Sequence, residues 1–324
     1  MASPRLTVSA VKQLNLSPRS LQNSCNIRRS LSPRTPDKLL GLNKCKVRTT
    51  WKHRVLPFNI DTPNRVKIIN NGLGNEEKSI LGYGGFGAVY KASYKGNQVA
   101  VKIIKQLIQN DSTVEAEKHA STLIHPNIVR IFMIERGKIW SLIIMELCDT
   151  SLEEKLQETI LNKVERIHIL KAIACALQFC HNSGIIHADV KPKNVLIASD
   201  GQPKLADFGS SILIGEMGKI TTSLYGTPGY VAPEVIKGRT PCIESDIYSL
   251  SILAWQLLSR KAPFSGYHPH TILYLTGRGE RPVDNNIDDG YHGDYKMLYQ
   301  KMWSDNTAMR PPMSVVIEKL NNFL

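Results

Sequence analysis

His187-Ala188-Asp189-Val190-Lys191-Pro192-Lys193-Asn194, followed by Asp207-Phe208-Gly209, is the stretch of sequence that decides the fold. It supplies two carboxylates, an amide and two lysines within a short length of chain. Phosphoryl transfer needs a carboxylate to orient the hydroxyl nucleophile and oxygen ligands for a divalent cation. Asp189 is therefore the candidate for orienting the hydroxyl, and Asn194 and Asp207 are the candidate Mg²⁺ ligands, because magnesium prefers hard oxygen donors.

Two further residues indicate which hydroxyl would be the acceptor. Lys191 can offset charge on the transferring phosphate, and Thr227 of Gly226-Thr227-Pro228-Gly229-Tyr230-Val231-Ala232-Pro233-Glu234 can bridge to it. This pair favours serine or threonine acceptors over tyrosine. His187 is expected to pack beneath Phe208 rather than to carry protons.

Upstream, Leu81-Gly82-Tyr83-Gly84-Gly85-Phe86-Gly87-Ala88-Val89-Tyr90 predicts two strands joined by a glycine-rich turn. Glycines allow backbone to approach phosphates closely, and Phe86 can close over them. Dinucleotide-binding folds also use G-x-G-x-x-G, but here Val89 continues a strand instead of opening a helix. Residues Leu81 to Val89 are therefore candidate ATP contacts.

The next strand, Gln98-Val99-Ala100-Val101-Lys102, directs Ala100 and Lys102 to the same side. Lys102 can neutralise the α and β phosphates, and Ala100 leaves room for adenine. A helix predicted over Ser112 to Ile124 carries Glu115 and Glu117, about 200° apart around the helix. Only one of them can face Lys102, and the spacing to His125-Pro126-Asn127 favours Glu117.

The apolar segment Leu142 to Cys148 predicts a strand that leads into a hinge. Met145 would guard the back of the nucleotide pocket, and backbone groups from Glu146 to Cys148 would pair with adenine. Cys148 itself is expected to be a structural thiol. Leu196, in the predicted strand Val195-Leu196-Ile197, completes the candidate nucleotide contacts.

The net charge of +13 is concentrated at the start of the chain. Residues 1–75 hold 14 of the 41 Lys and Arg residues but only Asp37 and Asp61 among the 28 acidic ones, so the rest is nearly neutral. Residues 1–72 are predicted to be a disordered, basic, Ser/Pro-rich tail, because they cannot bury enough apolar surface. Proline-directed sites occur at Ser3, Ser17, Ser32, Thr35 and Thr62. The alternative for the tail is a mitochondrial presequence.

Apolar runs and cysteines indicate the cellular compartment. The longest apolar runs, Ser141 to Leu147 and Ser249 to Leu258, are too short for a membrane span. The cysteines follow no metal-ligand spacing, and the sequence lacks the pattern of a secretory leader, so a reducing, cytoplasmic setting is expected. These cysteines are Cys25, Cys45, Cys148, Cys175, Cys180 and Cys242.

The ordered motifs from Leu73 onward resemble the eukaryotic serine/threonine protein kinase family. The resemblance extends to Asp246, which in that family braces the catalytic loop, and to Arg310, which pairs with Glu234. It implies an α+β, bilobal protein kinase fold: a small antiparallel β lobe with one main helix over residues 73–148, and a larger, mainly α-helical lobe over residues 149–324. ATP and Mg²⁺ would bind between the lobes.

Within that family the chain looks most like the Mos kinases, germ-cell MAP kinase kinase kinases. The resemblance rests on Lys91-Ala92-Ser93-Tyr94-Lys95-Gly96, on Leu205 to Ser211, on Ala262-Pro263-Phe264-Ser265-Gly266 with Thr271 to Tyr274, and on the initial Ser3-Pro4. It implies a MAP kinase kinase as substrate, activation of the MAP kinase cascade, and a role in oocyte meiosis. A monomer with no nucleic-acid partner and no membrane partner is expected.

Two features separate the chain from most regulated kinases. Ala188 replaces the arginine that normally precedes the catalytic aspartate, so activation is not expected to depend on a phosphorylated activation loop. A final amphipathic helix is predicted over Pro312 to Leu324, with no regulatory module after it. The alternatives are a serine/threonine kinase of another pathway and a pseudokinase scaffold, although Lys102, Asp189, Asn194 and Asp207 are all retained.

Overall fold

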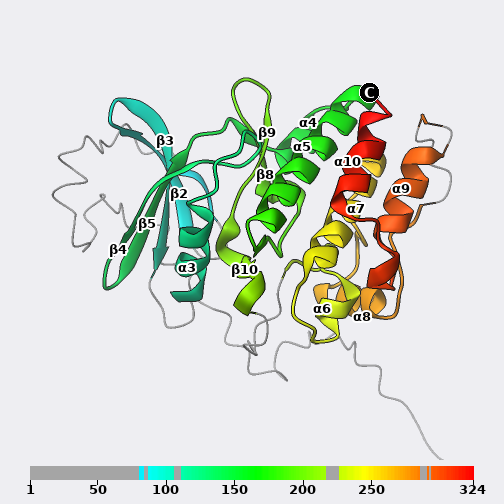
Figure 1. Ribbon diagram of the computed structural model, residues 1–324. Coiled ribbons are helices and arrows are strands. Elements are labelled where there is room, and N and C mark those ends of the chain that lie inside the picture. Colours follow the sequence, from blue (N-terminus) through cyan, green and yellow to red (C-terminus); the bar gives the residue numbers. More distant parts are fainter. Residues whose placement is uncertain (1–79, 84–86, 106–110, 217–225, 285–289, 292) are drawn as a thin grey trace, which may run out of the picture. The chain divides into compact units, whose positions relative to one another are not determined.

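The computed structural model describes residues 80–83, 87–105, 111–216, 226–284, 290–291 and 293–324 (Figure 1). All of them belong to the unit Leu56–Leu324, one of two into which the chain divides. The predictions for the tail and for Gly84, Gly85 and Phe86 lie outside the described residues, as do Thr221, Thr222 and Ser223 of the activation loop.

Five antiparallel strands form the main sheet (Figure 1). The order across it is β1-β2-β3-β5-β4, and β3 is buried along most of its length. That burial fits its run of apolar residues flanked by a strand on each side. The bounds are β1 Ile80–Tyr83, β2 Gly87–Tyr94, β3 Asn97–Lys105, β4 Ile131–Arg136 and β5 Trp140–Glu146.

The strand expected over Leu142 to Cys148 ends earlier, at Glu146. Its pairing with β3 finishes where Val99 lies opposite Glu146, two residues after the start of β3. Beyond that point there is almost no partner strand left to bond, so Leu147 and Cys148 leave the sheet. The predicted hinge therefore begins directly after Glu146.

One helix, α3 Asp111–Ala120, accompanies the sheet. It is shorter than the helix predicted over Ser112 to Ile124. The hydroxyls of Ser121 and Thr122 donate to the carbonyls of Lys118 and His119, at 2.7 and 2.9 Å. Hydroxyl groups that bond backbone carbonyls in this way compete with continuation of the helix.

The rest of the described chain is mainly helical. α5 lies beside α7 and α10, and one large apolar core joins these helices. α7 is buried along nearly its whole length, from Ser245 to Leu258. The helices are α4 Leu152–Glu158, α5 Lys163–Asn182, α6 Pro233–Ile236, α7 Ile243–Ser259, α8 Pro269–Gly277, α9 Asp294–Met302 and α10 Met313–Asn321.

Short strands form two further small sheets. β6 Thr150–Ser151, β8 Val195–Ile197 and β9 Pro203–Leu205 form one small sheet, and β7 Ile185–Ile186 pairs with β10 Ile212–Leu213. The predicted α+β fold class, with an antiparallel lobe and a mainly helical lobe, is confirmed. Within the described ranges, no helix has the length and apolar character that crossing a bilayer requires.

Candidate active site

Lys102 on β3 lies between two carboxylates. Its Nζ donates to Glu117 Oε1 at 2.6 Å and to Asp207 Oδ1 at 2.7 Å. Burial alone would lower the pKa of Lys102, but the charges of Asp207 and Glu117 outweigh it and raise that pKa. For Asp207 the effect of burial is opposite, because burial raises the pKa of a carboxyl group. The adjacent Lys102 ammonium outweighs burial and holds the pKa of Asp207 below its usual value. The site therefore keeps a buried cation and a partly exposed anion together.

Glu117, and not Glu115, is the α3 residue that reaches Lys102. Glu117 is buried, and burial raises the pKa of its carboxyl group. Glu115 is on the outer face of the helix, 3.5 Å from Arg136 and 3.4 Å from Lys118. The helical angle between the two residues explains why Glu117 is buried and Glu115 is only half-buried.

A second cluster surrounds Asp189. Its Oδ2 accepts from Lys191 Nζ at 2.6 Å, and its Oδ1 accepts from Thr227 Oγ1 at 2.7 Å. Lys191 also donates to Thr227 Oγ1, at 2.6 Å. Asn194 donates to the backbone and side-chain oxygens of Asp189, at 2.9 and 3.1 Å. The structure thus brings all four predicted side chains together, although Thr227 is far along the chain from the other three.

Asp246 on α7 fixes the backbone that carries this cluster. Its two oxygens accept the backbone N–H groups of His187 and Ala188, each at 2.9 Å. Burial would raise the pKa of Asp246, but the hydrogen bond from His181 and the nearby histidines lower it overall. A buried carboxylate bonded to backbone amides is a strong, charge-assisted anchor. Ala188 is held at φ +62°, a left-handed conformation that non-glycine residues rarely adopt.

The contact between His181 and Asp246 could not be predicted from the sequence. His181 Nε2 lies 2.8 Å from Asp246 Oδ2, and both side chains are buried. The two residues are 65 positions apart and belong to different helices. The spacing of apolar residues along α5 could have placed His181 on its buried face, but not against a particular carboxylate.

His187 packs as predicted. Its ring is fully buried and lies edge-on to Phe208, with 4.8 Å between ring centroids. The ring contacts Ala206 O through Nε2 at 3.1 Å and the Asp189 N–H through Nδ1 at 3.3 Å. Because both ring nitrogens bond to backbone groups of the loop, neither is available to a substrate.

The candidate metal ligands present a suitable donor set. Asn194 directs its amide nitrogen at Asp189, which leaves its amide oxygen as the donor for a cation. The Asp207 side chain is one-third exposed, at 33%, and its depressed pKa keeps it ionised. The described residues hold no group of three or more His, Cys, Asp or Glu side chains suited to a metal. One carboxylate and one amide oxygen fit Mg²⁺, which retains water and takes phosphate oxygens for its other positions.

The candidate nucleotide contacts lie on several strands. Val89 is opposite Lys102, and Ala100 is opposite Met145, in the paired β2, β3 and β5. Leu81, Gly82 and Tyr83 belong to β1, and Ala88 is buried in β2. Leu196 is the half-buried middle residue of β8.

Some of the hinge groups already form contacts within the protein. The Glu146 N–H donates to Arg130 O at 2.9 Å, so adenine could pair with Glu146 only through its carbonyl. Its carboxylate lies 3.0 Å from Lys204. Burial raises the pKa of the Cys148 thiol to about 12, which keeps it protonated and unreactive, as expected for a structural cysteine.

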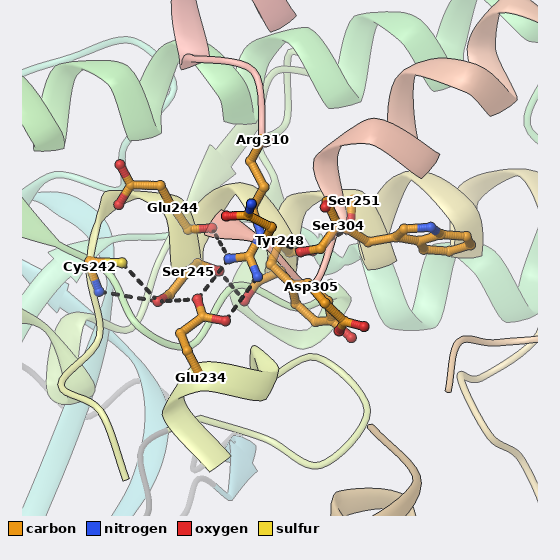
Figure 2. A network of polar contacts seen from close by, with 12 residues as sticks. Glu234, Cys242, Glu244, Ser245, Tyr248, Ser251, Ser304, Asp305 and Arg310 are labelled. Carbon is orange, nitrogen blue, oxygen red and sulfur yellow. Dashed lines mark hydrogen bonds and ion pairs between the residues drawn. The ribbon is translucent and has the colours of Figure 1, made fainter. Parts of the chain in front are cut away.

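Arg310 and Glu234 form a buried pair in the helical lobe (Figure 2). Two parallel hydrogen bonds of 2.7 and 2.8 Å join the guanidinium to the carboxylate, and Ser245 Oγ donates a third to Glu234 at 3.0 Å. The guanidinium carbon also lies 5.2 Å from the centre of the Tyr248 ring. This pair fastens α6 to the segment before α10, and the Ser245 hydrogen bond joins α6 to α7.

Comparison with known proteins agrees with this geometry. The family model described as "Protein kinase domain" matches residues 75–320. Serine/threonine-protein kinase mos of Patiria pectinifera is 33% identical over 74% of this chain and 72% of its own length. Serine/threonine-protein kinase mos of Xenopus laevis is 30% identical over 74% and 73%. Dual specificity protein kinase shkD of Dictyostelium discoideum is 32% identical over 77% of this chain but 34% of its own length.

The family match covers both clusters and the two lobes that carry them, and the similar proteins include serine/threonine kinases. The chain therefore belongs to the protein kinase family, and it is a protein-serine/threonine kinase.

Proposed function

We propose that this kinase phosphorylates a MAP kinase kinase on activation-loop serine or threonine, and that Asp189, Lys191, Lys102 and Glu117 do the catalytic work. The observation that carries the residue assignment is the hydrogen-bonded cluster of Asp189, Lys191, Thr227 and Asn194. The protein kinase family uses ATP and Mg²⁺ in general.

Asp189 would receive the acceptor hydroxyl. Its carboxylate is held from both sides by Lys191 and Thr227, which fixes the direction of its oxygens. A substrate serine or threonine hydroxyl can take the place of the Thr227 hydroxyl as a donor to Asp189. Lys191 is then positioned to offset charge on the transferred group, and positioning with charge compensation supplies most of this catalysis.

Lys102 would bind the α and β phosphates of ATP, with Glu117 keeping its ammonium in place. The 2.6 Å bond to Glu117 joins α3 to the sheet, so a shift of α3 would misplace Lys102. Asn194 and Asp207 would hold Mg²⁺, which neutralises phosphate charge when bound. The residues of β1 and β2, with Ala100, Met145, Glu146, Cys148 and Leu196, would enclose the nucleotide.

The substrate proposal rests on the similarity to the two mos kinases and on the motifs Leu205 to Ser211 and Ala262 to Tyr274. A role in oocyte meiosis, through the MAP kinase cascade in the cytoplasm, follows from the same resemblance. A serine/threonine kinase of another pathway is the alternative. A pseudokinase scaffold is disfavoured, because the structure brings the key side chains together instead of leaving one displaced.

The test is a substrate panel with purified enzyme, radiolabelled ATP and catalytically inactive MAP kinase kinase, followed by mapping of the phosphorylated residues by mass spectrometry. We expect phosphate on activation-loop serine or threonine and none on tyrosine. Activity on general substrates without modification of the MAP kinase kinase would favour another pathway. Phosphotyrosine would contradict the acceptor assignment and would resemble the dual specificity named for shkD.

A further inference from the structure

Lys193 is a cation of the catalytic loop for which the proposed mechanism has no use. It follows Asp189 by four residues and is exposed. Its Nζ donates to the backbone carbonyl of Tyr83 on β1, at 3.3 Å. The side chain therefore extends from the helical lobe towards the strand that leads into the glycine-rich turn, at the opening of the site.

The charge of Lys193 is not compensated as that of Lys191 is. Lys191 lies 2.6 Å from the Asp189 carboxylate. In the part of the chain that the structure describes, no carboxylate lies within 4.0 Å of Lys193 Nζ, and its hydrogen-bond partner is a neutral carbonyl. The bond to this carbonyl is already charge-assisted through the ammonium, but a carboxylate would add the attraction between two opposite charges. An incoming carboxylate would therefore displace the Tyr83 carbonyl.

Glu154, at the start of α4, is a carboxylate whose charge interacts with that of Lys193, but its oxygens are engaged elsewhere. Glu154 accepts from the Ser151 N–H at 3.0 Å and from Thr150 Oγ1 at 2.9 Å, which caps α4. These hydrogen bonds, with a smaller contribution from the charge of Lys193, lower the pKa of Glu154.

We propose that Lys193 selects protein substrates that carry an acidic residue close to the acceptor serine or threonine. The acceptor must reach Asp189, and an extended peptide advances about 3.3 Å per residue. An Asp or Glu within about four positions of the acceptor could then meet the Lys193 ammonium. This inference rests on the proposed role of Asp189 and adds a preference that the acceptor chemistry alone does not set.

The experiment compares peptides that share one acceptor serine in a neutral background and carry Asp, Ala or Lys at each flanking position in turn. The enzymes are wild type, Lys193→Met, which removes the charge, and Lys193→Glu, which reverses it. Lys319→Met, at an exposed lysine of α10, is the matched control. kcat/KM for each peptide and KM for ATP are both measured.

In the wild type, we expect the best-placed Asp to raise kcat/KM roughly three- to fivefold over Ala, the upper part of the range of an exposed charge pair. Lys193→Met should abolish the difference, Lys193→Glu should favour Lys over Asp at that position, and Lys319→Met should behave as wild type. KM for ATP should stay unchanged in all four proteins.

Three results would overturn the inference. The first is a wild-type enzyme that treats Asp and Ala peptides alike, and the second is an Asp preference that survives in Lys193→Met. The third is a change confined to KM for ATP, which would assign Lys193 to the nucleotide phosphates. In each case transfer to the neutral peptide would leave the kinase assignment intact, whereas an enzyme that modifies no peptide would contradict the proposed function together with this inference.

Discussion

Glu234 and Arg310 carry opposite charges in a setting that nearly excludes water, with 6% and 5% of their surfaces exposed. Burial would raise the pKa of Glu234, but its hydrogen bonds to Arg310 and the charge of that residue lower it overall. A pair of this kind contributes little when compared with well-packed apolar residues. Removing one partner alone is costly, because the other remains charged and buried.

Arg310→Met should therefore lower the free energy of unfolding at pH 7 by about 3–5 kcal/mol. The contribution of Glu234 to the pH dependence of the unfolding free energy should also change sign in Arg310→Met. In the wild type the depressed pKa of Glu234 gives stability that is present above the unfolded value near 4.5 and is lost as the pH falls through the lower folded value. In the variant, buried Glu234 should have a raised pKa, so protonation in the folded state should relieve the deficit as the pH falls from 7 towards 5.

Denaturant unfolding at several pH values measures this, with Glu234→Gln/Arg310→Met as the control in which the titrating group is absent. A deficit in Arg310→Met that is constant between pH 7 and 5 would show that Glu234 is not the group responsible.

Ala188 predicts that activity does not require phosphate on the activation loop. Because an alanine side chain cannot bind a phosphate, we expect the triple variant Thr221→Ala, Thr222→Ala, Ser223→Ala to keep kcat within about threefold of wild type. The measurement is the steady-state rate on a peptide substrate, with mass spectrometry to confirm that the loop carries no phosphate. Near-complete loss of activity, restored by acidic replacements at the same positions, would contradict this account.

At the scale of elements, the approach of β2 to β3 depends on a missing side chain. A Cβ added to Gly87 would lie 1.8 Å from Ile103 O, a backbone atom that cannot move without disturbing the strand pairing. The sequence had suggested that the glycines of this segment make room for phosphates. For Gly87 the structure supplies a nearer reason, which is contact with the neighbouring strand.

Gly87→Ala should destabilise the protein by about 1–3 kcal/mol and weaken ATP binding, because relieving the clash must displace β2 from β3. Gly82→Ala is the matched control, since an added Cβ at Gly82 meets no atom within 4 Å and the residue is in the same pair of strands. Thermal unfolding and nucleotide titration would be compared for both. Equal melting temperatures for the two variants would refute the explanation.

Elements could be predicted from sequence where the cause was local. The alternation in β3, the turn before β2 and the apolar run of β8 were sufficient to locate those strands. The ends of β5 and α3 were placed too far along the chain, because they depend on the length of the partner strand and on hydroxyl groups that bond carbonyls. The bracing of the catalytic loop by Asp246 came only from the family resemblance, and the His181 contact depends on how α5 packs against α7.

At the scale of the whole molecule, we propose that residues 73–324 form the catalytic unit and that the basic segment 1–72 is not needed for chemistry. The family model begins at residue 75, and every described contact lies at or beyond residue 80. Deletion of residues 1–72 should leave kcat and KM for ATP within about twofold of the full chain, because a domain with its own core functions alone.

Steady-state kinetics of both forms, with circular dichroism to verify folding, would measure this. A folded deletion protein with a tenfold lower kcat would mean that the first 72 residues take part in catalysis.

The most direct test of the central claim is the rate of phosphate transfer from radiolabelled ATP to a serine peptide by wild-type enzyme and by Asp189→Asn. The substitution keeps the size of the side chain and removes its charge, so thermal unfolding should be nearly unchanged while kcat falls by a factor of about 10²–10⁴. A folded Asp189→Asn protein that retained more than about a tenth of the wild-type rate would contradict the assignment of Asp189 as the residue that receives the acceptor hydroxyl.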